Sequence, residues 1–237
     1  MKILETNKAL LLTNILNKEI ENYKNKPVSL LLKELEIEST SKNVNRMIFD
    51  RIIAKSNNKE KIQNLLKSLP CTIKTVNLEW NNLLKESISL NVFKYNDIFT
   101  EEWLNSTLRS YFDNTTFIFV VFKKNGHDSY LEKVKVWSMP KSILDCGVKE
   151  TWDKTKNLIC QGKIVNYIDK RNRFITYFPT SSDTKYIHVR PHAQNRNDTL
   201  PLPVIDKVTG KNSFVKHSFW LNSNFVRKII VEDKFYE

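Results

Sequence analysis

The longest apolar run of the sequence is Phe117-Ile118-Phe119-Val120-Val121-Phe122, which follows directly on Thr116. A short run of aromatic and β-branched residues without a polar face is typical of a strand buried on both faces of a sheet. Asn125-Gly126 then provides a turn signal, and residues 132–138 alternate between apolar and polar as the next strand. These features predict a sheet with residues 116–122 at its centre.

Helical periodicity dominates the residues before this sheet, from 1 to 69. Apolar side chains recur at three- and four-residue spacing in four stripes, and Pro27 and Pro70 interrupt the pattern. We expect Ser29 to cap the second of these helices, residues 30–37. The stripes are interpreted as core rather than as functional sites.

Strands and helices mix in the rest of the chain. Alternation predicts strands over residues 72–78, 87–93, 163–167, 174–178 and 186–189. Helices are expected over residues 100–111, with Thr100 as N-cap, over residues 140–160, and in part of residues 219–231. The order indicates an α/β or α+β protein, with a mixed sheet flanked by helices. We predict an N-terminal helical region, 1–69, and a core, 70–237, as one compact unit.

The charge balance favours a polyanionic partner. The chain has 237 residues, a formal net charge of +12 and a pI near 9.5. A lysine-rich, merely solvated surface is the alternative, but half of the eight arginines lie between Arg171 and Arg196. Seven basic residues and only two acidic ones occur between Lys163 and Arg196. This excess marks a candidate nucleic-acid face.

Other bulk features predict a cytoplasmic protein. No apolar run approaches the length of a membrane span, and the N-terminus lacks signal-peptide features. The three cysteines show no metal-binding spacing and are expected to be reduced thiols. His188 and His192 have zinc-like spacing, but Pro191 lies between them and no glutamate follows His188. No Gly-x-Ser-x-Gly or phosphate-binding motif occurs, which disfavours zinc and nucleophilic-triad enzymes.

Two segments have a composition that is unusual for a core. Residues 186–197 lead from a strand into a loop and supply Arg, His, Gln and Asn donors. Arginine can bond a guanine edge at two points, and asparagine or glutamine can do so for adenine. Residues 216–225 interleave aromatics with cations and amides. Each segment is compatible with DNA contact or with core support, for example with Phe219 and Phe225 buried.

Several short motifs, in this order and spacing, resemble a known family. They are Ile73-Lys74-Thr75-Val76, Lys85-Glu86-Ser87, Phe119-Val120-Val121-Phe122, Val136-Trp137-Ser138-Met139-Pro140, Thr151-Trp152-Asp153-Lys154-Thr155, His188-Val189-Arg190-Pro191-His192, Thr199-Leu200-Pro201 and Ser218-Phe219-Trp220-Leu221-Asn222-Ser223-Asn224-Phe225. Together they resemble the MutH-type endonucleases, and more closely the C-terminal half of the two-domain staphylococcal GATC restriction endonuclease. The resemblance extends from about Val44 to Phe225.

The resemblance implies a restriction-endonuclease-like fold and recognition of duplex 5′-GATC. It implies base contacts by Arg190, Pro191 and Trp220, the last replacing the family's tyrosine hydroxyl with an indole donor. The full set of residues expected to bind DNA is Arg190, Pro191, His192, Asn195, Arg196, Lys216, Trp220 and Asn222, supported by a basic patch of Arg171, Arg173 and Lys185.

The resemblance also implies that catalytic acids are missing. Nucleases of this fold hold Mg²⁺ with an Asp and the Glu of a Glu-x-Lys motif. The matching positions here are Leu65, Thr72 and Lys74. We therefore expect no catalytic residues, no metal site and no cofactor for binding. The partners implied are double-stranded DNA and a separate catalytic MutH-like domain or subunit, which this chain would assist as an effector.

Two alternatives remain open. The chain is an active Mg²⁺-dependent nuclease if acids at unusual positions, such as Glu60, Glu79 or Glu86, complete a site. It is a protein-interaction or antirestriction protein if its DNA face has decayed. Retention of the arginine cluster and Trp220 argues against the second alternative.

Overall fold

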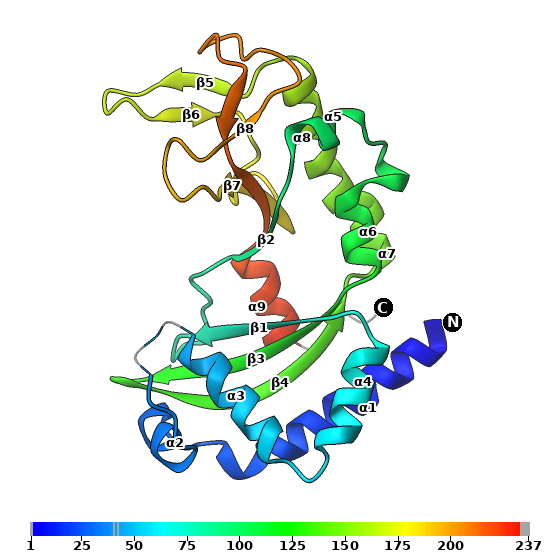
Figure 1. Ribbon diagram of the computed structural model, residues 1–237, viewed down its shortest axis with the longest axis vertical. Helices are drawn as coiled ribbons and strands as arrows, with labels where there is room; N and C mark the ends of the chain where they lie inside the picture. The colour runs from blue at the N-terminus through cyan, green and yellow to red at the C-terminus, as the bar shows by residue number, and fades with distance from the viewer. Residues whose placement is uncertain (1, 40, 42, 233–237) are drawn as a thin grey trace. The chain divides into compact units, whose positions relative to one another are not determined.

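The chain divides into two compact units, shown in the computed structural model (Figure 1). The structure describes residues 2–39, 41 and 43–232. The first unit comprises Met1–Glu86, Asn114–Met139 and Arg227–Glu237, and the second comprises Ser87–Asp113 and Pro140–Val226. This division differs from the predicted boundary after residue 69, because the N-terminal helices pack on a sheet formed by later residues.

The first unit is a three-stranded sheet with an N-terminal helical region. Strand β3 (Thr116–Asn125) lies between β1 (Cys71–Leu78), to which it is parallel, and β4 (Asp128–Ser138), to which it is antiparallel. The helices are α1 (Lys2–Ile20), α2 (Val28–Glu34), α3 (Val44–Lys55) and α4 (Lys59–Ser68), with a 3-10 turn, Glu21–Tyr23, after α1. Residues 116–122 are all buried, which confirms the predicted central strand.

One apolar core joins the helices to the sheet. Leu16 of α1, Ile48 of α3 and Ile62 of α4 are fully buried in the same cluster as Ile118 and Val120 of β3. Burial of this kind stabilises a fold by about 25 cal/mol for each Å² of apolar surface removed from water. The predicted turn at Asn125-Gly126 joins β3 to β4, and Gly126 has the positive φ of +63° that such turns require.

The predicted cap of α2 is wrong. Helix α2 begins at Val28, because the extended backbone of Pro27 starts the helix one residue before Ser29. Ser29 therefore lies in the first turn, where its hydroxyl donates to Asp128 Oδ2 at 2.5 Å.

The second unit contains another three-stranded sheet and two ribbons. The sheet order is β2 (Ile88–Val92), β10 (His217–Leu221) and β7 (Ile187–Pro191), and β10 is antiparallel to both neighbours. The ribbons pair β5 (Val165–Ile168) with β6 (Phe174–Thr176), and β8 (Thr199–Pro201) with β9 (Ser213–Val215). The predicted mixed α/β class is confirmed.

Helices complete the second unit. They are α5 (Tyr95–Thr100), α6 (Thr107–Asp113), α7 (Lys141–Ile143) and α8 (Lys149–Cys160). A π-helical turn, Leu144–Val148, joins α7 to α8, and a 3-10 turn, Trp103–Asn105, lies between α5 and α6. Helix α9 (Ser223–Val231) crosses the division between the units at Arg227.

The helix predicted over residues 100–111 is confirmed only over residues 107–111, which belong to α6, and its predicted start is wrong. Thr100 ends α5 rather than capping a new helix, and its hydroxyl donates to Asn96 O at 3.0 Å. The chain then becomes extended at Glu101 and Glu102. This break buries Trp103, whose ring lies 5.6 Å from that of Trp152 and whose indole N–H donates to Asp145.

The described ranges contain no helix that is long and apolar enough to cross a membrane.

Candidate nucleic-acid interface

The pairing of β7 with β10 brings the two unusual sequence segments together. Arg190 lies opposite Ser218, and His188 lies opposite Trp220. Because successive side chains of a strand point to opposite faces, these four residues share one face of the strand pair. Val189 and Phe219, which also lie opposite each other, occupy the other face and are buried. The strand pair therefore has a core face and a polar face.

Arg190 and Trp220 form the centre of the polar face. The guanidinium carbon of Arg190 lies 4.9 Å from the centroid of the Trp220 ring, which is cation–π geometry worth about 1 kcal/mol at such a site. Arg190 is exposed and has no ion pair with any described residue. The ring thus orients the guanidinium without occupying its N–H donors. Trp220 Nε1 is buried and has no hydrogen-bond partner among the described residues.

His192 and Pro191 extend this cluster. Nδ1 of His192 lies 2.9 Å from the hydroxyl of Ser218, and its ring centroid lies 5.5 Å from that of Trp220. Pro191 ends β7 and is exposed. The structure therefore brings together Arg190, His192 and Trp220 from two distant parts of the sequence, with Pro191 beside them.

The loop after β7 holds the predicted residues Asn195 and Arg196 at the surface. Its shape depends on Asp198, which accepts from the backbone N–H of Gln194 at 3.0 Å and pairs with Lys216 at 2.5 Å. Lys216 is therefore neutralised by a neighbour. The side-chain oxygen of Asn195 accepts from the backbone N–H of Asn197, which leaves its amide nitrogen for other contacts.

Asn222 differs from the other predicted residues because it is buried. Its Oδ1 accepts from His188 Nδ1, and its Nδ2 donates to the carbonyl oxygen of Thr184 at 2.7 Å. Burial lowers the pKa of His188, the hydrogen bond to Asn222 opposes this shift, and the charge of Arg190 adds a smaller lowering. Asn222 and His188 thus support the strands that present Arg190 and Trp220.

The basic side chains predicted to support DNA binding differ in whether an acidic neighbour neutralises their charge. Arg171 and Arg173 lie in the turn between β5 and β6, and Lys185 precedes β7. Arg173 pairs with Asp169 at 2.7 Å, whereas Arg171 and Lys185 are exposed and have no ion pair with a described residue. Sequence reasoning missed Ser218, His188 and Thr184 as supports, because the strand register brings Ser218 and His188 to the site and a hydrogen bond from Asn222 brings in Thr184.

The predicted degenerate catalytic position lies in the first unit. The side chains of Cys71 and Ile73 lie on one face of β1 and pack against the core that the helices cover. The side chains of Thr72 and Lys74 alternate with them and lie on the other face. Leu65 of α4 packs against the core on the helix side of β1. Strand β1 therefore separates Leu65 from Lys74. Burial lowers the pKa of Lys74, whose register partner on β3 is Phe119.

The acids considered as substitutes do not assemble a site. Glu60 and Glu86 are exposed, and Glu79 is held by Lys124 at 3.1 Å and Lys85 at 3.2 Å, bonds that lower its pKa. The part of the chain that the structure describes has no group of three His, Cys, Asp or Glu side chains placed to hold a metal ion. Mg²⁺ needs several oxygen ligands in near-octahedral geometry, whereas Thr72 and Lys74 place one hydroxyl and one amine at the matched positions of β1.

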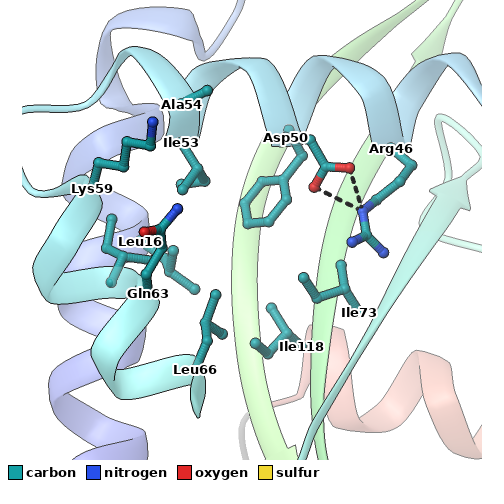
Figure 2. Close-up of a pocket in the computed structure, with 12 residues that line it drawn as sticks. Leu16, Arg46, Asp50, Ile53, Ala54, Lys59, Gln63, Leu66, Ile73 and Ile118 are labelled. Atoms are coloured by element: carbon teal, nitrogen blue, oxygen red, sulfur yellow. Dashed lines mark hydrogen bonds and ion pairs between the residues drawn. The ribbon is translucent and has the colours of Figure 1, made fainter.

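A cavity of about 230 Å³ also lies in the first unit, between α1, α3 and α4 and the sheet (Figure 2). Its walls are largely apolar, including Leu16 and Ile118, and the Arg46–Asp50 ion pair lies at one end. Lys59 and Gln63 complete the polar lining. This lining lacks the paired acids that nuclease chemistry requires.

Comparison with known proteins gives one informative relative. The chain is similar to the type II restriction enzyme Sau3AI of Staphylococcus aureus, with 27% identity over an alignment of 247 residues. The alignment includes 91% of this chain and 50% of the relative, so the chain spans about half the length of the curated relative it matches. The similarity supports a relationship to restriction endonucleases. No protein-family model matches the chain.

Proposed function

We propose that the chain is a pseudo-catalytic DNA-binding module that recognises duplex 5′-GATC. The observation that carries this proposal is the exposed Arg190, whose guanidinium lies over the Trp220 ring and makes no ion pair with a described residue. An arginine held in a plane can donate two parallel hydrogen bonds to O6 and N7 of guanine in the major groove. The resemblance to MutH-type endonucleases supplies the sequence 5′-GATC.

Neighbouring side chains complete the proposed contact surface. Pro191, exposed at the end of β7, and the Trp220 ring provide apolar surface for base edges. His192, Asn195 and Arg196 are exposed and contribute polar contacts. Lys185 adds phosphate contacts, which supply salt-dependent affinity without sequence preference.

The proposed inability to cut DNA rests on residues of the first unit. Thr72 has a hydroxyl at the position that the resemblance matches to the Glu of Glu-x-Lys, and Leu65, the position matched to the Asp, is apolar and lies on the other side of β1. We therefore assign the chain an effector role beside a separate MutH-like catalytic domain or subunit. The relative's greater length supports such a second half.

Binding of labelled duplexes by the purified chain tests the proposal. We expect Arg190→Ala to weaken binding to a GATC duplex by roughly ten- to a hundredfold, because a bidentate base contact is worth about 1–3 kcal/mol. Binding to a scrambled duplex should change little, so the ratio of the two affinities falls. Trp220→Ala should lower the same ratio by removing the surface that orients Arg190.

Arg51→Ala is the matched control. Arg51 is exposed on α3 and, like Arg190, has no ion pair with any described residue. It should leave the ratio of GATC to scrambled affinity unchanged. If Arg190→Ala and Arg51→Ala behave alike, Arg190 does not recognise bases and the proposal fails.

A further inference from the structure

The ribbon of β5 and β6 has an aromatic outer face. Tyr167 lies opposite Ile175, and Tyr177 follows Ile175 by two residues, so alternation places all three on one face. The backbone N–H of Tyr177 donates to Ile164 O, which extends the ladder to this position. The exposed fractions of Tyr167 and Tyr177 are 52% and 53%, so both rings are open to a partner.

The inner face of the ribbon is tied to the strand that bears Trp220. Phe174 lies opposite Ile168 and packs against Phe214 of β9, with ring centroids 5.7 Å apart. Phe214 stacks in turn on His217, the first residue of β10, at 5.5 Å. This row of rings fixes the ribbon to β10 and leaves the tyrosine face free.

Positive charge surrounds the ribbon. Lys170 and Arg171 lie in its turn, are exposed and have no ion pair among residues that the structure describes. Asp169 is occupied by Arg173 and by the backbone N–H groups of residues 171 and 173. Asp206, the acid near the base of the ribbon, is buried and bonded to the backbone of residues 164 and 165. The accessible charge of the ribbon is therefore cationic.

We propose that this ribbon is a second DNA-contacting element, which grips duplex DNA outside the four-base-pair site. The inference rests on the proposed function, because it takes GATC duplex as the ligand. The tyrosine face packs against sugars, and Lys170 and Arg171 contact phosphates. A two-stranded ribbon fits the major groove, and tyrosine, lysine and arginine are frequent donors to the DNA backbone. Charge complementarity selects DNA over an apolar protein partner.

Duplex length separates the ribbon from the site around Arg190. One duplex carries GATC with flanks that extend about one helical turn, about 10 base pairs, to each side, and a short duplex carries almost no flank. The variants are Tyr167→Ala/Tyr177→Ala and Lys170→Ala/Arg171→Ala. Arg51→Ala/Lys59→Ala in the first unit is the charge-matched control. All changed side chains lie at the surface, and a thermal melt of each variant checks folding.

We expect the two ribbon variants to weaken binding to the long duplex by about tenfold and to leave binding to the short duplex unchanged. The charge variant should also lower the slope of log affinity against log salt by about 2, roughly 1 for each phosphate that the chain no longer neutralises. The ratio of GATC to scrambled affinity should stay constant. The inference is overturned if both ribbon variants bind the long duplex with wild-type affinity. This holds even if the same variants lose binding to another protein.

The experiment distinguishes a failure of the ribbon inference from a failure of the proposed function. If the unmodified chain binds GATC and scrambled duplexes equally, base recognition is absent and the proposed function falls. If the unmodified chain discriminates but the ribbon variants match it on the long duplex, only the ribbon inference falls.

Discussion

At the scale of residues, the neighbours of each arginine decide which of them can recognise a ligand. Arg46, Arg109, Arg173 and Arg227 are held by carboxylates within the described part of the chain. Arg190 is held by an aromatic ring instead, so its position is restricted while its donors stay available. This difference favours Arg190 over the paired arginines as the base-contacting residue.

Asn222 should matter for stability more than for direct contact. Asn222→Ala removes a buried side chain and leaves His188 Nδ1 and the carbonyl oxygen of Thr184 without the hydrogen bonds that Asn222 makes to them. We expect a loss of about 2 kcal/mol in the free energy of unfolding, measured by chemical denaturation. Asn224→Ala, an exposed position two residues later, should change stability by less than about 0.5 kcal/mol. Equal effects of the two variants would contradict the supporting role of Asn222.

His217 should make stability depend on pH. Burial lowers its pKa to about 4, below the ordinary histidine value of 6.5, and burial also lowers the pKa of His188. The unfolded chain therefore binds protons first as pH falls, and stability present above about pH 6.5 is lost toward pH 4. The loss from His217 approaches about 3 kcal/mol, since one pKa unit is 1.36 kcal/mol. Unfolding titrations from pH 7 to 4.5 should show the decline, and His217→Gln should flatten it.

At the scale of elements, periodicity predicted strands that match β1 to β7, whereas β8, β9 and β10 were not expected from it. The central strand follows from its uniform apolar character, and its burial bears this out. The break after Thr100 could not be predicted, because it depends on Trp103 reaching Trp152 and Asp145, about 40 to 50 positions later. The placement of Asn222 depends on the register of β7 with β10, which lie far apart in the sequence.

Strand β1 should prevent a simple restoration of nuclease activity. Leu65→Asp/Thr72→Glu introduces both acids that the family motif requires, but Leu65 packs on the helix side of β1 and Lys74 alternates away from it. We expect this variant to remain inactive on GATC plasmid with Mg²⁺. Nicking or linearisation of the plasmid above the unmodified chain would show that the two positions face one metal site.

At the scale of the whole molecule, the residues proposed for recognition and the proposed degenerate catalytic position belong to different units. Arg190 and Trp220 lie in the second unit, whereas Thr72 and Lys74 lie in the first. Each unit has its own sheet, so the strand pair of the second unit does not depend on which residues occupy the matched positions of the first. This separation is consistent with a chain that retains a binding face without retaining catalysis.

The most direct measurement follows binding and strand integrity together. The purified chain is incubated with a GATC duplex or a scrambled duplex of the same composition, with Mg²⁺ and at moderate salt. We expect the GATC duplex to bind at least about tenfold more tightly, within the range that single base-pair changes produce, and both duplexes to stay uncut. Equal affinity for the two duplexes would show that the chain does not recognise GATC, and Mg²⁺-dependent cleavage at GATC would show that it is a nuclease.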